Sequence, residues 1–144
     1  MTKLLDARTS QNASFSNSLS QLILVGTPGS LFGIIGLNVP NAVGPIRTQL
    51  SGTVGVQLPL LPLATNVTIR VYRGPTNASP LIYSSSQNLD LSILGPQILT
   101  FIASDINIPK PASNQLVYSA YISVNTLGTL RVGPESFNGV AYSG

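Results

Sequence analysis

The sequence predicts an all-β protein: a single antiparallel β-sandwich of the jelly-roll type, with about eight strands and an extended N-terminal arm. Three observations predict this fold. Apolar and polar side chains alternate with a period of two along several segments, which is the pattern of strands that bury one face. Glycine and proline separate these segments at spacings of roughly ten residues. No long segment carries the apolar stripe of an amphipathic helix.

The predicted strands follow one another along the chain after the arm. The clearest alternation lies in residues 47–58, where Leu50 and Val54 share one face. The same pattern recurs in residues 67–73 and 116–125. Prolines fall at segment ends, where a missing N–H costs no ladder bond. The predicted set is 21–25, 32–39, 47–58, 67–73, 81–85, 89–94, 98–103, 116–125, and 130–132 together with 140–142.

Residues 1–18 differ from the rest and are predicted to form an arm, or connector, ahead of a sandwich domain over residues 19–144. The segment has no glycine or proline and holds three of the eleven charged side chains. Three alternatives remain open for it: a disordered tail, an amphipathic first turn, or an extended arm that orders on a partner. Its candidate subunit-docking residues are Leu4, Leu5, Phe15 and Leu19.

The composition argues against catalysis. The chain has no histidine and no cysteine, which are the commonest general base and the usual nucleophilic or zinc-binding side chains. Asp105 and Glu135 could meet as a pair of carboxylates, but solvated or turn-capping roles are favoured for both. Neither Lys3 nor Lys110 is placed to be buried beside a serine. We therefore expect no enzyme activity, no catalytic residue, no cofactor and no metal.

The charge pattern also limits the partners. The seven basic side chains are scattered, whereas nucleic-acid binding needs them clustered. The most apolar stretch, residues 31–39, is too short to span a membrane and contains glycines. Charged residues make up 8% of the chain, against roughly 25% in an ordinary soluble domain. Because little repulsion keeps copies apart, the composition predicts self-association.

Two local features have competing interpretations. Residues 133–139 (GPESFNG) are predicted to form a turn, with Asn138-Gly139 at a positive-φ corner; Glu135 and Arg131 could instead pair or contact a neighbour. The five tyrosines could form a platform for a glycan, but roles in the sheet surface or an interface are favoured.

Three segments carry a resemblance to a known family: LSGTVGVQLPLL (50–61), NVTIRVYRGPTNASPLIYSSS (66–86) and LRVGPESFNGVAYSG (130–144). Together they resemble jelly-roll subunits of the appendage fibres of bacterial endospores. The resemblance implies a flexible connector, here residues 1–18, which docks into neighbouring subunits. The best-known fibres of this kind cross-link their connectors through cysteines, and this chain has none.

The sequence therefore favours a structural subunit that assembles with itself into an extracellular fibre on a cell or spore surface. No signal peptide is recognisable, so assembly in the mother cell is one expected route. A closed trimeric jelly-roll binding module, of the tumour-necrosis-factor or collagen-tip kind, is the alternative. A viral coat subunit is a further variant.

Overall fold

The structure is a computed structural model that describes residues 2–144; Met1, the first residue of the predicted arm, lies outside the described residues. It confirms an all-β antiparallel sandwich, with no helix among the described residues. The strands are β1 (Lys3–Ala13), β2 (Gln21–Leu22), β3 (Ser30–Asn38), β4 (Ile46–Gln57), β5 (Asn66–Arg73), β6 (Leu81–Asn88), β7 (Gln97–Ile108), β8 (Gln115–Val124) and β9 (Leu130–Ser143).

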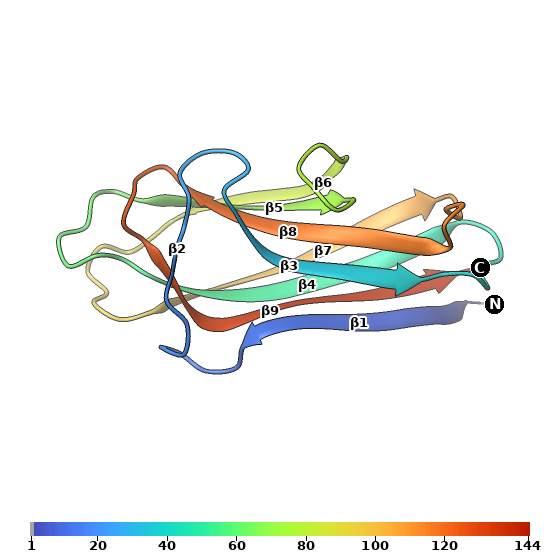
Figure 1. Cartoon of the computed structure of the whole chain (residues 1–144), viewed down its shortest axis with the longest axis horizontal. Helices are drawn as coiled ribbons and strands as arrows, with labels where there is room; N and C mark the ends of the chain where they lie inside the picture. The colour runs from blue at the N-terminus through green and yellow to red at the C-terminus, as the bar shows by residue number, and fades with distance from the viewer. Residues whose placement is uncertain (1) are drawn as a thin grey trace.

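The strand order is that of a jelly roll (Figure 1). One sheet has the order β1-β9-β4-β7, with the two-residue strand β2 added beside β9, and the other has the order β3-β8-β5-β6. Four nested antiparallel pairs build it: β1 with β9, β3 with β8, β4 with β7, and β5 with β6. This is the double Greek key of a jelly roll, so the predicted fold class is confirmed.

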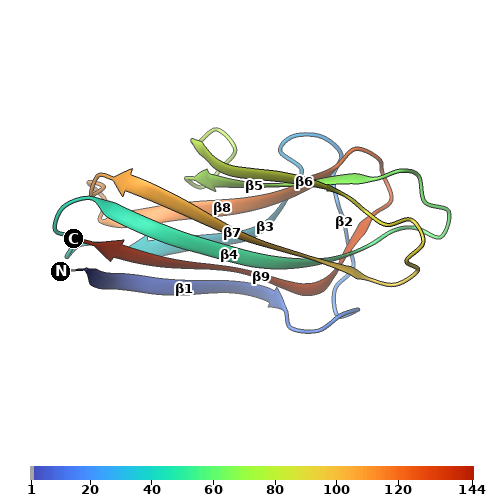
Figure 2. The same cartoon turned by 180° about the vertical axis from the view of Figure 1, so that it is seen from behind.

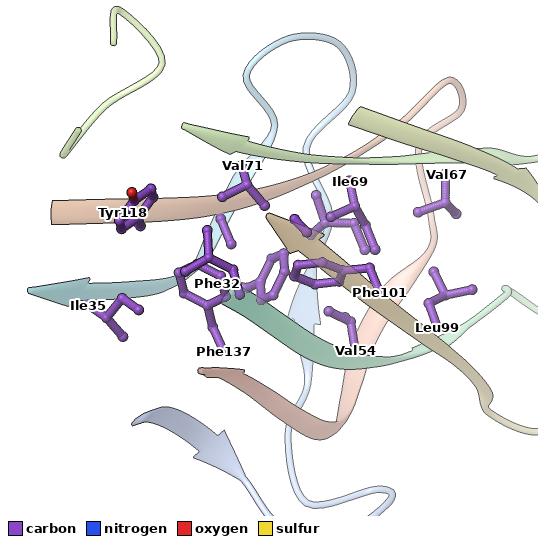
Figure 3. Close-up of a cluster of buried hydrophobic side chains, with 14 of the residues drawn as sticks. Phe32, Ile35, Val54, Val67, Ile69, Val71, Leu99, Phe101, Tyr118 and Phe137 are labelled. Atoms are coloured by element: carbon purple, nitrogen blue, oxygen red, sulfur yellow. The ribbon is translucent and has the colours of Figure 1, made fainter. Parts of the chain in front are cut away.

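The core lies between the two sheets, where the alternating residues meet (Figure 3). Three phenylalanines from different strands form its centre. The ring of Phe101 lies 6.2 Å from that of Phe32 in an edge-on arrangement and 6.2 Å from that of Phe137 in a stacked one. Such pairs stabilise beyond the apolar area that they bury. The inward positions predicted from the alternation of residues 47–58, such as Leu50 and Val54, are buried as expected.

The predicted N-terminal arm is not confirmed, because residues 3–13 form β1, the first strand of the jelly roll (Figure 2). β1 pairs with β9 from Lys3 opposite Ser143 to Ala13 opposite Glu135. The polar composition of residues 3–13 did not indicate a strand, since an edge strand exposes more of its side chains than a central one. β1 thus belongs to the same sandwich as residues 19–144.

The turn predicted over residues 133–139 is wrong, because this segment continues the long strand β9. Asn138 pairs with Ser51 on one side and Thr9 on the other. Gly139 lies within the ladder, and a glycine is required there because a Cβ would collide with side chains of the core. The one positive-φ position of this segment is Gly133, at a register shift between β4 and β9.

Two other predicted strands also differ. Residues 89–94 form a loop with turns, and only the first two residues of segment 21–25 form a strand, β2. Both segments are apolar enough to suggest burial, but several of their leucines point into solvent. The loop over residues 89–94 contributes to the surface described next.

Candidate self-association surface

Three loops meet at the end of the sandwich that lies away from the chain termini (Figure 1). They connect β4 to β5, β6 to β7, and β8 to β9. The strand registers fix this arrangement, because the ends that flank these loops are paired: Gln57 with Leu130, Asn66 with Asn88, and Val67 with Val124.

Hydrogen bonds join the three loops to one another. The Leu89 amide donates to the Thr65 carbonyl oxygen at 2.9 Å, which joins the β4–β5 and β6–β7 loops. The hydroxyls of Thr65 and Thr126 lie 3.1 Å apart, which joins the β4–β5 and β8–β9 loops. The Asn125 side-chain oxygen accepts from the Asn66 amide at 2.7 Å. These bonds hold the three loops to one another.

The β6–β7 loop is also fixed by its own contacts. One carboxylate oxygen of Asp90 accepts from the Ser92 hydroxyl at 2.6 Å and from the Ser92 amide at 2.9 Å. These bonds lower the pKa of Asp90, the hydroxyl contact contributing most. The Gln97 side chain bonds the Asp90 backbone in both directions, at 2.9 and 3.0 Å. The loop is a folded element.

Large apolar side chains cover the outside of these loops. Leu60 is 95% exposed, Leu61 91% and Leu94 86%. A hollow of about 230 Å³ lies between the β4–β5 and β6–β7 loops, with Leu58 and Pro59 among its lining residues. We call this surface the leucine cap; its members are Leu60, Leu61, Leu63, Leu91, Ile93, Leu94 and Leu127.

The two carboxylates singled out from the sequence do not form a catalytic pair. Asp105 pairs with Thr48 of β4 and Glu135 with Val54, six positions further along the strand. At a rise of about 3.4 Å per residue they lie roughly 20 Å apart, well beyond the separation in a two-carboxylate glycosidase.

Each carboxylate has its own arginine. Glu135 accepts two bonds from Arg131, both at 2.6 Å, and also bonds Asn12 of β1. Asp105 accepts from Arg73 at 2.6 and 2.7 Å and from the hydroxyl of Tyr118 at 2.8 Å. The bonds that Arg73 donates to Asp105 raise the pKa of Arg73, and burial raises the pKa of Tyr118. Both acids thus bind groups of their own chain: Asp105 reaches Arg73 and Tyr118 of the opposite sheet, and Glu135 pairs with Arg131 of its own strand rather than with a neighbour.

The tyrosines do not line one face. Tyr72, Tyr118 and Tyr121 are buried, and the first and last of these pack edge-on at 5.5 Å. Tyr83 stacks on the core ring of Phe101 at 5.6 Å. Tyr142 lies under the guanidinium of Arg47 at 5.8 Å from its ring centre. This arrangement does not provide a glycan platform, the less favoured of the two interpretations of the tyrosines.

The four predicted docking residues have separate environments. Leu4 is exposed on β1, whereas Leu5 packs partly buried against the core. Phe15 is 75% exposed in the loop after β1. Leu19 is half-buried, and its amide donates to the Val132 carbonyl oxygen at 3.2 Å. The structure does not bring them together as one docking surface.

The leucine cap is not among the surfaces predicted from the sequence. The run LPLLPL over residues 58–63 begins where the predicted strand 47–58 ends. The available signal was its two prolines, which exclude a central strand and leave the leucines between them without a ladder.

Comparison with known proteins identifies no family for this chain and finds only weak structural likenesses. No family model and no curated protein matches the chain. An arabinose-bound α-L-arabinofuranosidase is similar over 99% of this chain and 23% of its own, with a TM-score of 0.39 and 11% identity. A structure of infectious bursal disease virus, Gx strain, is similar over 95% of this chain and 37% of its own, with a TM-score of 0.35 and 11% identity.

The VP2 subviral particle of the same virus is similar over 99% of this chain and 37% of its own, with a TM-score of 0.28 and 15% identity. The chain therefore spans well under half the length of each of these proteins. Likenesses this small carry no argument about function. None of the three is a spore protein, so the resemblance to endospore appendage subunits stays a prediction.

No helix long and apolar enough to cross a membrane occurs within residues 2–144.

Proposed function

We propose that this protein is a non-catalytic structural subunit that assembles with copies of itself through the leucine cap. The observation that carries the proposal is the cap: seven large apolar side chains on hydrogen-bonded loops at one end of a jelly roll. An ordinary surface exposes the polar groups of its loops and buries their apolar ones. These loops instead expose seven large apolar side chains and bond several of their polar groups to one another, which is expected of a surface that is covered in the assembled state.

The size of the cap fits an interface between subunits. Five of its seven side chains are more than 60% exposed, whereas a monomer rarely exposes a large contiguous apolar surface. A standard stable interface involves roughly 20–30 residues of each partner, so the cap could form the apolar centre of one contact.

A second copy fits the cap better than a lipid surface does. The three loops, residues 58–65, 89–96 and 125–129, contain no lysine or arginine, whereas an anionic membrane attracts basic residues. Two caps in contact bury leucine against leucine, and the only charge of these loops, Asp90, is already bonded to Ser92. Asp90 is exposed, so a contact that leaves it in solvent at the rim buries no unpaired charge.

We further propose that the assembly is an extracellular fibre of the endospore-appendage kind, at a cell or spore surface. The support is the resemblance in segments 50–61, 66–86 and 130–144. The connector mechanism of that family would require β1 to leave its own β9 and pair with a neighbour's. Contact through the cap requires no such exchange. A closed trimer or a viral-type shell is the alternative outcome of the test below.

The test is a double substitution, Leu60→Ser with Leu61→Ser, compared with the intact chain by sedimentation velocity and negative-stain electron microscopy. Both side chains are almost fully exposed, so their loss leaves the fold intact. We expect the intact chain to form fibres and the variant to form none at up to ten times the concentration at which the intact chain does.

The matched control is Leu4→Ser with Val43→Ser, which removes two exposed apolar side chains outside the cap and should assemble like the intact chain. Fibres of the cap variant at the intact chain's concentration overturn the proposal. Discrete trimers or closed shells from the intact chain would retain self-assembly and reject the fibre.

A further inference from the structure

The strand β7 has one edge without a strand partner. It is the last strand of its sheet and pairs with β4 along the other edge. Its neighbour in space, β6, belongs to the opposite sheet, and within residues 2–144 no strand continues the ladder beyond β7. About half of the N–H and C=O groups of β7 therefore point to an open edge, since they alternate between the two edges of an antiparallel strand.

β7 carries two of the features that normally protect such an edge, both near its end: a register shift between its pairs with Thr48 and Ile46, where Asn107 has a positive φ, and the inward charge of Asp105. Residues 97–104 have none of them. Natural edge strands are short, bulged, or carry lysine, proline or inward charges. β7 is 12 residues long and contains no proline or glycine. Its one charged side chain, Asp105, points inward to Arg73. Its outward side chains include Ile98, Ile102 and Ile106, which are 48%, 76% and 63% exposed.

The three isoleucines are spaced symmetrically, four residues on either side of Ile102. In an antiparallel pair of two β7 strands related by a two-fold axis at Ile102, each Ile98 faces Ile106 of the second copy. The two Ile102 side chains face each other, and Thr100 faces Ser104. With a period of two, all these side chains lie on the same outer face of the joined sheet.

We propose that β7 pairs antiparallel with β7 of a second copy, in the register centred on Ile102, and so joins two sheets into one. The register is self-complementary and places no charged side chain of one strand opposite a like charge of the other: Asp105 faces the inward Leu99. Aliphatic cross-strand pairs of this kind stabilise a sheet, and the main-chain bonds supply the affinity of strand addition.

This inference rests on the proposed function, because it supplies the second contact of a self-assembling subunit. The leucine cap lies at one end of the sandwich and β7 along one side (Figure 2), so both contacts can form at once. A subunit with two different self-contacts extends into a chain of subunits, since each contact leaves the other free.

Cysteine cross-linking tests the register directly, because the chain has no cysteine of its own. Each substitution replaces an exposed isoleucine, so the fold is retained. Under mild oxidation we expect Ile102→Cys to give a covalent dimer from most of the chains. Ile98→Cys alone should give no covalent dimer, and a mixture of Ile98→Cys with Ile106→Cys should cross-link. Gln49→Cys, an exposed position on the inner strand β4, is the control for random collision.

Cross-linking of Ile102→Cys no faster than of Gln49→Cys overturns the proposal. Cross-linking of Ile98→Cys with itself overturns the register. Repeating the assay with Leu60→Ser and Leu61→Ser in the same chain separates the two contacts. If the chain with both serine substitutions still cross-links, the β7 contact forms without the cap. Sedimentation of the cap variant, compared with that of the intact chain, tests the cap contact alone, and an unchanged result would reject it.

Discussion

The two narrow sides of the sandwich differ in how their edge strands are protected. On one side β1 packs along β3, and polar side chains bridge the two sheets: Asp6 accepts from the Asn38 amide at 2.8 Å, and Asn12 donates to the Phe32 carbonyl oxygen at 2.8 Å. β1 also carries the charges Lys3, Asp6 and Arg8. On the other side β6 and β7 make few contacts, and the outward side chains of β7 are uncharged.

The difference teaches that edge protection is local. Charges and bridging bonds discourage the pairing of β1 or β3 with another chain. β7 has one such bridge, from Asp105 to Arg73 and Tyr118 of the other sheet, but its outward side chains are uncharged, and it is as long as any strand but β9. The less protected side is therefore the one on which we place strand pairing between copies. Substitutions on the two sides should act differently: those at β1 on stability, and those at β7 on association.

The largest effect is expected from deleting residues 1–18. The deletion removes β1, exposes an edge of β9 and takes away the Asn12 contact with the buried Glu135. Losing the first strand of a jelly roll should cost most of a stability that is about 5–15 kcal/mol for such a domain. We expect an unfolded or aggregated chain by circular dichroism. A truncated chain that stays folded at the intact chain's midpoint would make β1 the dispensable arm that the sequence predicted.

Glu135→Ala should have the next largest effect. It leaves Arg131 buried without its carboxylate, and Asn12 without one of its acceptors. Breaking a buried ion pair by removing one partner costs about 3–5 kcal/mol. Urea unfolding should show this loss, whereas Ile102→Thr on the open side should change stability by less than about 0.5 kcal/mol. Equal losses for the two variants would erase the distinction between the sides.

The smallest effect concerns pH at Asp6. The bond from the Asn38 amide lowers the pKa of Asp6 below its ordinary value of 3.8, with a further contribution from Arg8. A carboxylate with a depressed pKa stabilises the folded state above its unfolded pKa, and this stability is lost as the pH falls through the folded pKa. Asp6→Asn should therefore be less stable than the intact chain at pH 7, by up to about 1 kcal/mol, and nearly equal to it at pH 2. Urea midpoints at the two pH values measure this; a difference that persists at pH 2 would remove the carboxylate from the explanation.

Long, strongly alternating strands could be predicted from the sequence, and polar or interrupted ones could not. β4 and β5 alternate because each buries one face in the core, and β8 alternates in sequence although both of its faces are largely buried. β1 offers little apolar signal, since its main inward contacts are those of Leu5 and Ala13. β9 was divided because Asn138-Gly139 is a frequent turn dipeptide, whereas here the glycine is required by the lack of room for a Cβ.

The candidate surfaces were harder to predict than the fold. Low charge indicated self-association, but the segment chosen for it, residues 1–18, provides an edge strand. The leucines of segment 89–94 read as a buried strand because hydrophobicity alone does not distinguish burial in a core from burial by a partner. Only the tertiary arrangement brings this loop beside residues 58–65 and shows that Leu60 and Leu94 face outward.

The hydrogen bonds beneath the leucine cap have a consequence for how tightly copies would bind. Because Thr65, Leu89 and Asn125 hold the three loops in place, docking does not have to order them, and the usual entropic cost of immobilising flexible loops is small. The affinity of the contact then depends partly on the hydrogen bonds that hold the loops in place. Residues that never touch the second copy would determine how strongly it is held.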